Sequence, residues 1–143
     1  IKTENIDQKR VYLLGLSNGG AGTWHFAENH PDMFAAIAPC CGYIYNDGKY
    51  FLEAPGKGRY MEPTENETNA LKDMPIWAFA AADDNVVNPD GTRHTVKAIK
   101  EAGNKNIRET IYDAGMLGNN PHNSWKLAYH EQDLFPWMFK QKK

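Results

Sequence analysis

The sequence predicts an α/β fold in which a mostly parallel sheet is flanked by helices. Short apolar runs rich in β-branched and aromatic residues alternate with longer segments of helical periodicity. This alternation is typical of parallel sheets, because each crossover between parallel strands needs a helix-length connection. With 143 residues, the chain is long enough to bury a substantial core. It contains no internal repeat and no linker, so residues 1–143 are interpreted as one unit.

The predicted elements alternate along the chain. Apolar runs predict strands at residues 11–14, 34–38, 75–80 and 107–112. Helical patterns cover residues 18–29, 92–102 and 124–139. Pro31 ends the first helix, Gly103 follows the second, and Pro136 should break or kink the last one. Pro39 and Gly42 should close the second strand, and residues 88–91 are expected to form a turn.

Residues 43–73 have neither a helical nor a strand period. They are rich in Gly, Tyr, Asn and Glu, and we expect a long excursion with little regular structure. Long loops in compact domains are usually functional, which favours a lid-like wall beside a site. Its aromatic side chains would form that wall: Tyr43, Tyr45, Tyr50, Phe51 and Tyr60. The alternative is a surface loop without a functional role.

The first predicted strand leads into the pattern G-x-S-x-G at residues 15–19. In a nucleophile elbow this pattern turns the chain sharply from a strand into a helix and exposes a serine hydroxyl. Ser17 holds that position, and we expect no room for a side chain at Gly15 and Gly19. The helix N-terminus behind Ser17 favours an oxyanion there. A phosphate-binding loop is excluded, because Ala21 stands where its lysine is required.

A serine nucleophile needs a base, and the base needs a carboxylate that orients it. After a nucleophile elbow these residues follow in the order Ser, Asp or Glu, and His. Asp83 and Asp84 follow the third predicted strand, and His122 follows the fourth. All these candidates therefore leave the carboxyl ends of parallel strands, where α/β sheets place their sites.

The composition argues against several classes of partner. The formal net charge is −2 and no basic run exceeds residues 140–143, so binding to nucleic acids or anionic membranes has no electrostatic support. No apolar stretch approaches the length of a membrane span. The adjacent Cys40 and Cys41 are interpreted as small buried thiols, and they do not distinguish a cytoplasmic from a secreted location.

No metal site and no cofactor is predicted. The four histidines other than His122 lack the H-E-x-x-H or Cys/His spacing of zinc sites. They are interpreted as helix-surface or capping residues: His25, His30, His94 and His130. The acidic pairs at 65/67 and 83/84 could suggest two-carboxylate glycosidase chemistry, but solvated loop charges account for them more simply.

Six blocks, taken in order, resemble a known family. They are Gly15-Leu-Ser-Asn-Gly-Gly20, His30-Pro-Asp-Met-Phe-Ala-Ala36, Ala38-Pro-Cys-Cys-Gly42, Pro75-Ile-Trp-Ala-Phe79, Asp84-Asn-Val-Val87 and His122-Asn-Ser-Trp125. From about residue 7 to residue 139, the chain is similar to phospholipase/carboxylesterase-like, dienelactone-hydrolase-related esterases of the α/β-hydrolase superfamily. Feruloyl esterases and polyhydroxybutyrate depolymerase-like proteins are similar too.

The resemblance implies a Ser-His-Asp triad. Ser17 would be the nucleophile, Asp84 the acid and His122 the base, whereas Asp83 would be a neighbouring loop carboxylate. The register that favours Asp84 is the family's Asp-x-x-Val-Pro block. This chain departs from that block at Asn88, where the family usually has proline.

The resemblance also implies further site residues. Asn18 would supply one oxyanion donor through its backbone N–H. Trp125 and Tyr43 are candidates for binding substrate. The chain departs from the family's Ala-Gly-His-Asn-Ser-Trp block by an insertion at residues 116–121, which lengthens the loop before His122.

The family fold has several strands before the elbow, together with a loop that gives the second oxyanion N–H. Neither is found in this sequence. We therefore expect residues 1–143 to form the C-terminal part of an α/β-hydrolase catalytic domain, with its N-terminal part cleaved off or held in another chain. Alone, the strand at residues 11–14 would expose an apolar edge.

These observations favour a serine carboxylic-ester hydrolase that acts through a Ser-His-Asp triad and an acyl-enzyme intermediate. Its substrate would be a small-molecule ester, or an ester linked to a polysaccharide or a polyester. Two alternatives stay open. One is a serine peptidase of the prolyl-oligopeptidase type, which uses the same triad. The other is a hydrolase-like fragment that binds a ligand or partner without turnover.

Overall fold

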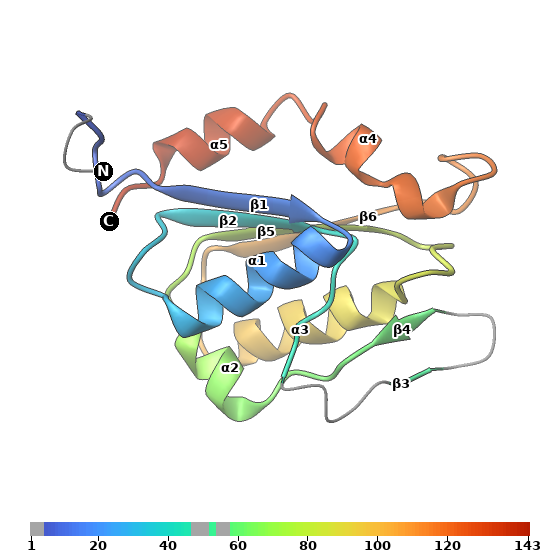
Figure 1. The fold of residues 1–143 in the computed structure, drawn as a ribbon, viewed down its shortest axis with the longest axis horizontal. Coiled ribbons are helices and arrows are strands. Elements are labelled where there is room, and N and C mark those ends of the chain that lie inside the picture. The colour runs from blue at the N-terminus through green and yellow to red at the C-terminus, as the bar shows by residue number, and fades with distance from the viewer. Residues whose placement is uncertain (1–4, 47–51, 54–57) are drawn as a thin grey trace.

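The computed structural model describes residues 5–46, 52–53 and 58–143. Within them, four parallel strands form one sheet in the order β1-β2-β5-β6 (Figure 1). The strands are β1 (Tyr12–Leu16), β2 (Ala36–Cys40), β5 (Ile76–Ala81) and β6 (Ile107–Tyr112). Two short strands, β3 (Leu52–Glu53) and β4 (Arg59–Tyr60), pair antiparallel as a separate ribbon.

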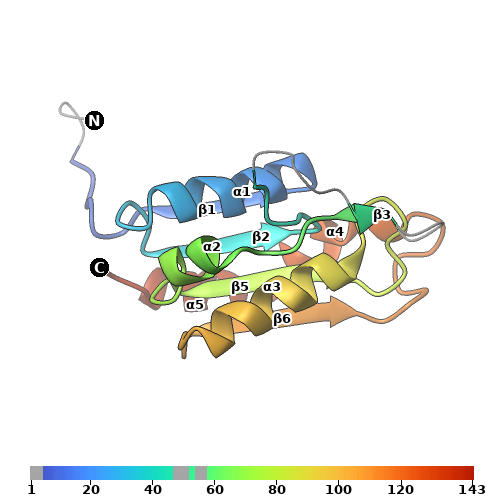
Figure 2. The same ribbon diagram turned by 90° about the horizontal axis from the view of Figure 1, so that it is seen from below.

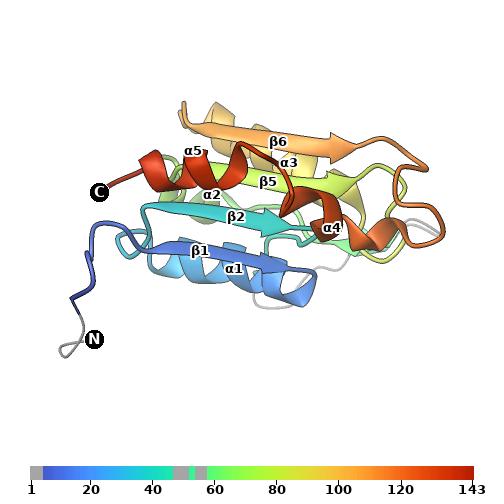
Figure 3. The same cartoon turned by 90° about the horizontal axis from the view of Figure 1, so that it is seen from above.

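Helices cover both faces of the four-stranded sheet. On one face lie α1 (Asn18–Asn29), α2 (Glu65–Ala70) and α3 (Pro89–Glu101), as seen from below in Figure 2. On the other lie α4 (Trp125–Ala128) and α5 (Leu134–Lys140), as seen from above in Figure 3. This three-layer arrangement confirms the predicted fold class, and β1, β2, β5 and β6 correspond to the four predicted strands.

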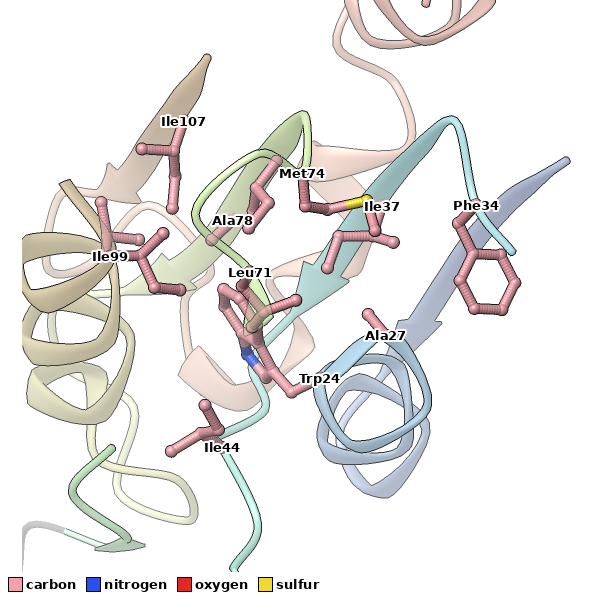
Figure 4. Packing of buried hydrophobic residues seen from close by; sticks show 12 residues of the cluster. Trp24, Ala27, Phe34, Ile37, Ile44, Leu71, Met74, Ala78, Ile99 and Ile107 are labelled. Atoms are coloured by element: carbon pink, nitrogen blue, oxygen red, sulfur yellow. The ribbon is translucent and has the colours of Figure 1, made fainter. Parts of the chain in front are cut away.

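Each face of the sheet has its own apolar core, because successive residues of a strand point to opposite faces. In β5, Ile76 and Ala78 join the cluster beneath α1 and α3, where Trp24 is 1% exposed (Figure 4). Trp77 and Phe79 of the same strand face the cluster under α4 and α5. Both layers of helix are therefore held to the sheet by apolar burial.

Three expectations about element boundaries are wrong. β2 continues through Pro39 to its last residue, and its register with β1 is unbroken there, with Pro39 opposite Gly15. α3 begins at Pro89 rather than residue 92. The expected turn before it is a helix start, because the Asn88 side chain accepts a hydrogen bond from the Asp90 N–H at 3.0 Å.

The predicted closing helix is two helices, and Pro136 does not break it. The interruption lies at residues 129–133, between α4 and α5. Pro136 is the third residue of α5. In the first turn of a helix the backbone N–H has no intrahelical acceptor, so proline is tolerated there.

The expectation of little regular structure in residues 43–73 is also wrong for the part that the structure describes. It contains β3, β4 and α2. A capping box starts α2: the Glu67 N–H donates to Thr64 Oγ1, and the Thr64 N–H donates to Glu67 Oε2 at 2.6 Å. Residues 47–51, with Tyr50 and Phe51 of the expected aromatic wall, lie outside the described residues. The lid-like role stays a prediction.

β1 is an edge strand of the described sheet, with β2 as its partner. Leu14 and Leu16 of this strand are 39% and 36% exposed. The apolar edge expected from the sequence is therefore present in the structure. In the ranges given above, no helix combines the length and the hydropathy needed to cross a membrane.

Candidate active site

Ser17 lies at the sharp turn between β1 and α1, where it is the N-cap of the helix. Its φ of 53° is in the left-handed region, which costs a residue with a side chain about 1–3 kcal/mol. Two backbone hydrogen bonds hold the turn: the Ser17 N–H donates to Cys40 O, and the Ala21 N–H donates to Ser17 O, both at 3.0 Å. The structure therefore has the strained strand–turn–helix geometry of a nucleophile elbow.

Close approach of the backbone at this turn involves a different set of glycines from the expected one. At Gly15, an added Cβ would lie 2.2 Å from Gly19 O, so the expectation for Gly15 is confirmed. At Gly19 it would meet nothing within 4 Å, so that expectation is wrong. The tight position is Gly20, where a Cβ would lie 2.4 Å from Cys40 O. The close backbone contacts of this turn therefore require glycine at positions 15 and 20, and position 20 lies just beyond the pattern G-x-S-x-G.

A continuous chain of hydrogen bonds joins the three candidate triad residues. The Ser17 hydroxyl donates to His122 Nε2, with 2.8 Å between the two atoms. The His122 Nδ1–H donates to Asp84 Oδ2, also at 2.8 Å. The three side chains come from loops after β1, β5 and β6, which end at the same edge of the sheet. Residues 105 positions apart are therefore brought into direct contact.

Asp84, rather than Asp83, faces the imidazole. Asp84 is 3% exposed, and its Oδ1 accepts hydrogen bonds from the backbone N–H groups of Val86 at 2.9 Å and Val87 at 3.0 Å. These bonds leave Oδ2 aimed at His122. Asp83 accepts a hydrogen bond from the Gly115 N–H at 2.9 Å and so ties two loops together.

The loop that carries Asp84 is also held by β4. The Arg59 N–H donates to Val86 O at 3.3 Å, and the Asn88 N–H donates to Arg59 O at 3.1 Å. Val87 and Arg59 form a parallel bridge. The excursion at residues 43–73 therefore contacts the acid loop directly through its C-terminal strand.

His122 lies in a short 3-10 helix, Pro121–Asn123, at the end of the lengthened loop. The insertion at residues 116–121 therefore does not displace the imidazole from Ser17 and Asp84. The hydrogen bond to Asp84 raises the pKa of His122 above its ordinary value of 6.5, although partial burial acts in the opposite direction. A raised pKa makes His122 a stronger base toward the serine proton.

The remaining candidates lie around this chain. Asn18 is the first residue of α1, so its backbone N–H is among those that a helix leaves without an intrahelical acceptor. The Trp125 ring stands edge-on to the His122 ring, with centroids 5.6 Å apart. Tyr43 is 8% exposed and packs in a cluster with Met61 and Val87. The geometry thus gives Trp125 and Tyr43 packing contacts, and their binding of substrate stays a prediction.

Cys41, interpreted from the sequence only as a small buried thiol, lies beside the triad candidates. It is 1% exposed, and its φ of 41° is the second positive φ of a residue other than glycine in the described chain. Its Sγ, a His122 ring nitrogen and an Asp84 carboxylate oxygen lie within 4.8 Å of one another. The Cys40 thiol hydrogen-bonds the Cys41 sulfur and thereby holds the pKa of Cys41 below its ordinary value. The position directly after β2, next to the strand of the elbow, was the available sequence signal.

Comparison with known proteins gives a family and a fold. Residues 1–141 match the prolyl oligopeptidase family. A crystal structure of a thermostable esterase superposes with a TM-score of 0.82 at 35% identity, over 99% of this chain and 34% of that one. This chain thus spans about a third of the length of that esterase.

Two further comparisons are shorter or more distant. A ferulic acid esterase superposes with a TM-score of 0.64 at 18% identity, over 94% of this chain and 53% of that one, which shows the shared fold. A bifunctional acetylxylan esterase/xylanase of Neocallimastix patriciarum is 51% identical over 41 residues, which make up 29% of this chain and 6% of that protein.

Proposed function

Since the chain belongs to the prolyl oligopeptidase family and has an α/β-hydrolase fold, we propose that it is the catalytic part of a serine carboxylic-ester hydrolase. The observation that carries this proposal is the pair of 2.8 Å hydrogen bonds that link Ser17 to His122 and His122 to Asp84. This geometry meets the requirement that a nucleophile contact its base and that the base contact its orienting carboxylate.

In the proposed mechanism, Ser17 Oγ attacks the carbonyl carbon of the ester while His122 Nε2 takes the hydroxyl proton. Asp84 accepts the Nδ1–H throughout, which keeps Nε2 free as the base and stabilises the imidazolium. His122 then gives the proton to the leaving alkoxide, and the acyl group stays on Ser17. Water attacks this acyl-enzyme in the same way, which releases the carboxylic acid and regenerates the serine hydroxyl.

The negative charge that develops on the carbonyl oxygen needs donors aimed at it. Asn18 supports this step, because its backbone N–H follows the nucleophile at the N-terminus of α1. The resemblance implies a second donor from a loop that precedes the elbow in the family fold. Half of the proposed oxyanion hole thus belongs to the residues described above.

Ester hydrolysis is preferred over peptide hydrolysis because the similarity to a thermostable esterase extends over 99% of the chain. The shorter match to an acetylxylan esterase/xylanase points to acyl esters on plant polysaccharide as one substrate class. Family membership favours a second candidate, a serine peptidase with the same triad. Matched acetyl esters, feruloyl esters, polyesters and aminoacyl anilides would rank these substrates by kcat/KM.

The decisive experiment is labelling of the full-length protein with a fluorophosphonate, together with hydrolysis of p-nitrophenyl acetate and butyrate. Residues 1–143 include two serines, Ser17 and Ser124. We expect Ser17→Ala to abolish labelling and to lower kcat by several orders of magnitude. Ser124→Ala is the matched control, because Ser124 is fully buried and contacts Cys40 Sγ at 3.4 Å. Absence of labelling in the intact protein would refute the proposal and favour a non-catalytic binding role.

A further inference from the structure

Cys41 brings a thiol into the candidate site that the hydrolytic mechanism does not use. Its sulfur, an Asp84 carboxylate oxygen and a His122 ring nitrogen lie within 4.8 Å of one another. We propose that these three side chains form an inhibitory binding site for a thiophilic divalent cation, with Zn²⁺ and Cd²⁺ as the probes. The inhibition rests on the proposed function, whereas the binding of the cation does not.

The donor set suits such a cation. Zn²⁺ is bound in proteins by thiolate, imidazole and carboxylate groups, and three protein ligands with one water are typical of its open sites. Soft thiolate ligands favour Zn²⁺ and Cd²⁺ over Mg²⁺ and Ca²⁺, which prefer oxygen. In a tetrahedral site with bonds of ~2.0–2.3 Å, ligand atoms lie roughly 3.5 Å apart. The three donor atoms, which lie within 4.8 Å of one another, would therefore have to draw somewhat closer together around the ion.

The three donors come from different elements, and two of them are firmly held. Cys41 follows β2, and its N–H donates to Phe79 O at 2.8 Å. Asp84 follows β5 and is fixed through its other oxygen by the Val86 and Val87 N–H groups. A site preformed in this way loses little conformational entropy when the ion binds.

The strained backbone of Cys41 supports the inference. Its φ of 41° is a conformation that favours glycine, and glycine follows it at position 42. The cysteine nevertheless occupies the strained position, and its sulfur is thereby directed at the triad candidates. Such outliers persist only where the surrounding structure determines them.

Binding would stop hydrolysis for a simple reason. The thiol proton leaves to solvent as the sulfur coordinates the ion, and a ring nitrogen of His122 donates its lone pair to the same ion. The imidazole is then held away from its hydrogen bonds with Asp84 and Ser17, so it cannot accept the serine proton. When a chelator removes the ion, the thiol takes back its proton, and the hydrogen bonds that link Ser17, His122 and Asp84 form again.

The ion would enter past His122. The His122 side chain is 13% exposed, whereas that of Asp84 is completely buried. Cys41 is also buried, with an exposed fraction of 1%. The same opening would admit the ester, so the cation should compete with substrate.

The first test compares two adjacent cysteines in the full-length protein. Zn²⁺ should inhibit ester hydrolysis reversibly, EDTA should restore the rate, and Mg²⁺ should have no effect. Loss of a residue that only hydrogen-bonds a metal ligand costs roughly 10–100-fold in metal affinity. Cys41 is proposed as a ligand itself, so Cys41→Ser should raise the inhibition constant for Zn²⁺ by at least about 100-fold. Cys40→Ser is the matched control, because Cys40 is a neighbouring buried thiol that is not one of the three grouped donors and contacts Ser124 Oγ. Each variant is compared with its own rate without metal.

The second test does not depend on activity. In Ser17→Ala, which keeps all three donors, Cd²⁺ should produce the ultraviolet charge-transfer absorption of a cadmium–thiolate bond at one equivalent. Cys41→Ser should lack this absorption, and Cys40→Ser should keep it. If the protein lacks esterase activity, this spectrum still decides the metal site. Absorption that is absent from Ser17→Ala, or unchanged by Cys41→Ser, would overturn the inference.

Discussion

Replacing Gly20 by alanine should destabilise the protein, whereas the same replacement at Gly19 should not. Both glycines lie in the first turn of α1. A Cβ at position 20 would lie 2.4 Å from Cys40 O and 3.1 Å from the Gly42 backbone, and one at position 19 would meet nothing within 4 Å. The pair therefore separates the effect of close packing from the change in helix propensity.

The structure sets the size of the effect. The obstructing atoms are backbone, so α1 must retreat from the end of β2 until the 2.4 Å contact exceeds the 3.0 Å below which real contacts essentially never occur. Overpacking of this kind costs ~1–3 kcal/mol. The change from glycine to alanine offsets about 0.5–1 kcal/mol of this cost, because alanine lowers the conformational entropy of the unfolded chain. We expect Gly20→Ala to lower the unfolding free energy by roughly 1 kcal/mol, and Gly19→Ala to raise it by up to ~1 kcal/mol.

The same shift should reach the nucleophile. The hydrogen bond from the Ser17 N–H to Cys40 O spans the contact that Gly20→Ala would open. A misplacement of about 1 Å can cost roughly 100-fold in rate, so kcat/KM should fall at least about tenfold. Urea unfolding followed by tryptophan fluorescence gives the stability from the midpoint at unchanged slope, and ester hydrolysis gives the rate. Equal effects of the two variants, or a Gly20→Ala protein as stable as the wild type, would refute the reasoning.

Four further outcomes follow from other contacts. Because Asp84 raises the pKa of His122, the acid limb of the pH profile of kcat/KM should have its midpoint above pH 6.5. Asp84→Asn should move this midpoint to lower pH and reduce kcat by about 10⁴-fold. A midpoint that does not move would contradict the role of Asp84 in raising the pKa. The raised pKa also means that His122 contributes stability below pH 6.5, and this contribution is lost as the pH rises through the folded-state pKa, as urea titrations at several pH values would show. Thr64→Ala removes the capping box of α2 and should cost about 1 kcal/mol of unfolding free energy in the same urea assay, whereas no loss would show that α2 is held by packing alone. Residues 1–143 should self-associate through β1, and Leu14→Lys should increase the monomer fraction in analytical ultracentrifugation. A wild-type protein that is already monomeric would exclude this edge as the contact.

The sheet and the triad candidates were predictable from sequence because their signals are local or ordered. The central strands β2 and β5 are buried along their whole length and the edge strands β1 and β6 only in part, yet all four appear in the sequence as short apolar or alternating runs. Ser17, Asp84 and His122 follow three of these runs in a fixed chain order. The carboxyl ends of parallel strands meet at one edge, so the order alone predicts their proximity.

Features that depend on contacts between distant elements were not predictable in the same way. The crowding at Gly20 arises where α1 meets the end of β2, and nothing in the pattern G-x-S-x-G requires it. The proximity of Cys41 to His122 depends on the path of the lengthened loop before His122. The break between α4 and α5 falls at residues without a helix-breaking proline, so Pro136 was the misleading signal.

The bridge between Arg59 and Val87 limits how residues 43–73 can vary. Because backbone hydrogen bonds on both sides of Val87 end on Arg59, this point of the segment is fixed to the loop that carries Asp84. Gly58 reinforces the attachment: its φ is +71°, and a Cβ there would lie 2.7 Å from the Val86 backbone. Insertions before Gly58 leave this attachment, and with it the carboxylate, in place. Insertions between Gly58 and Tyr60 would move the carboxylate itself, so exchange of this segment between homologous enzymes should preserve that junction.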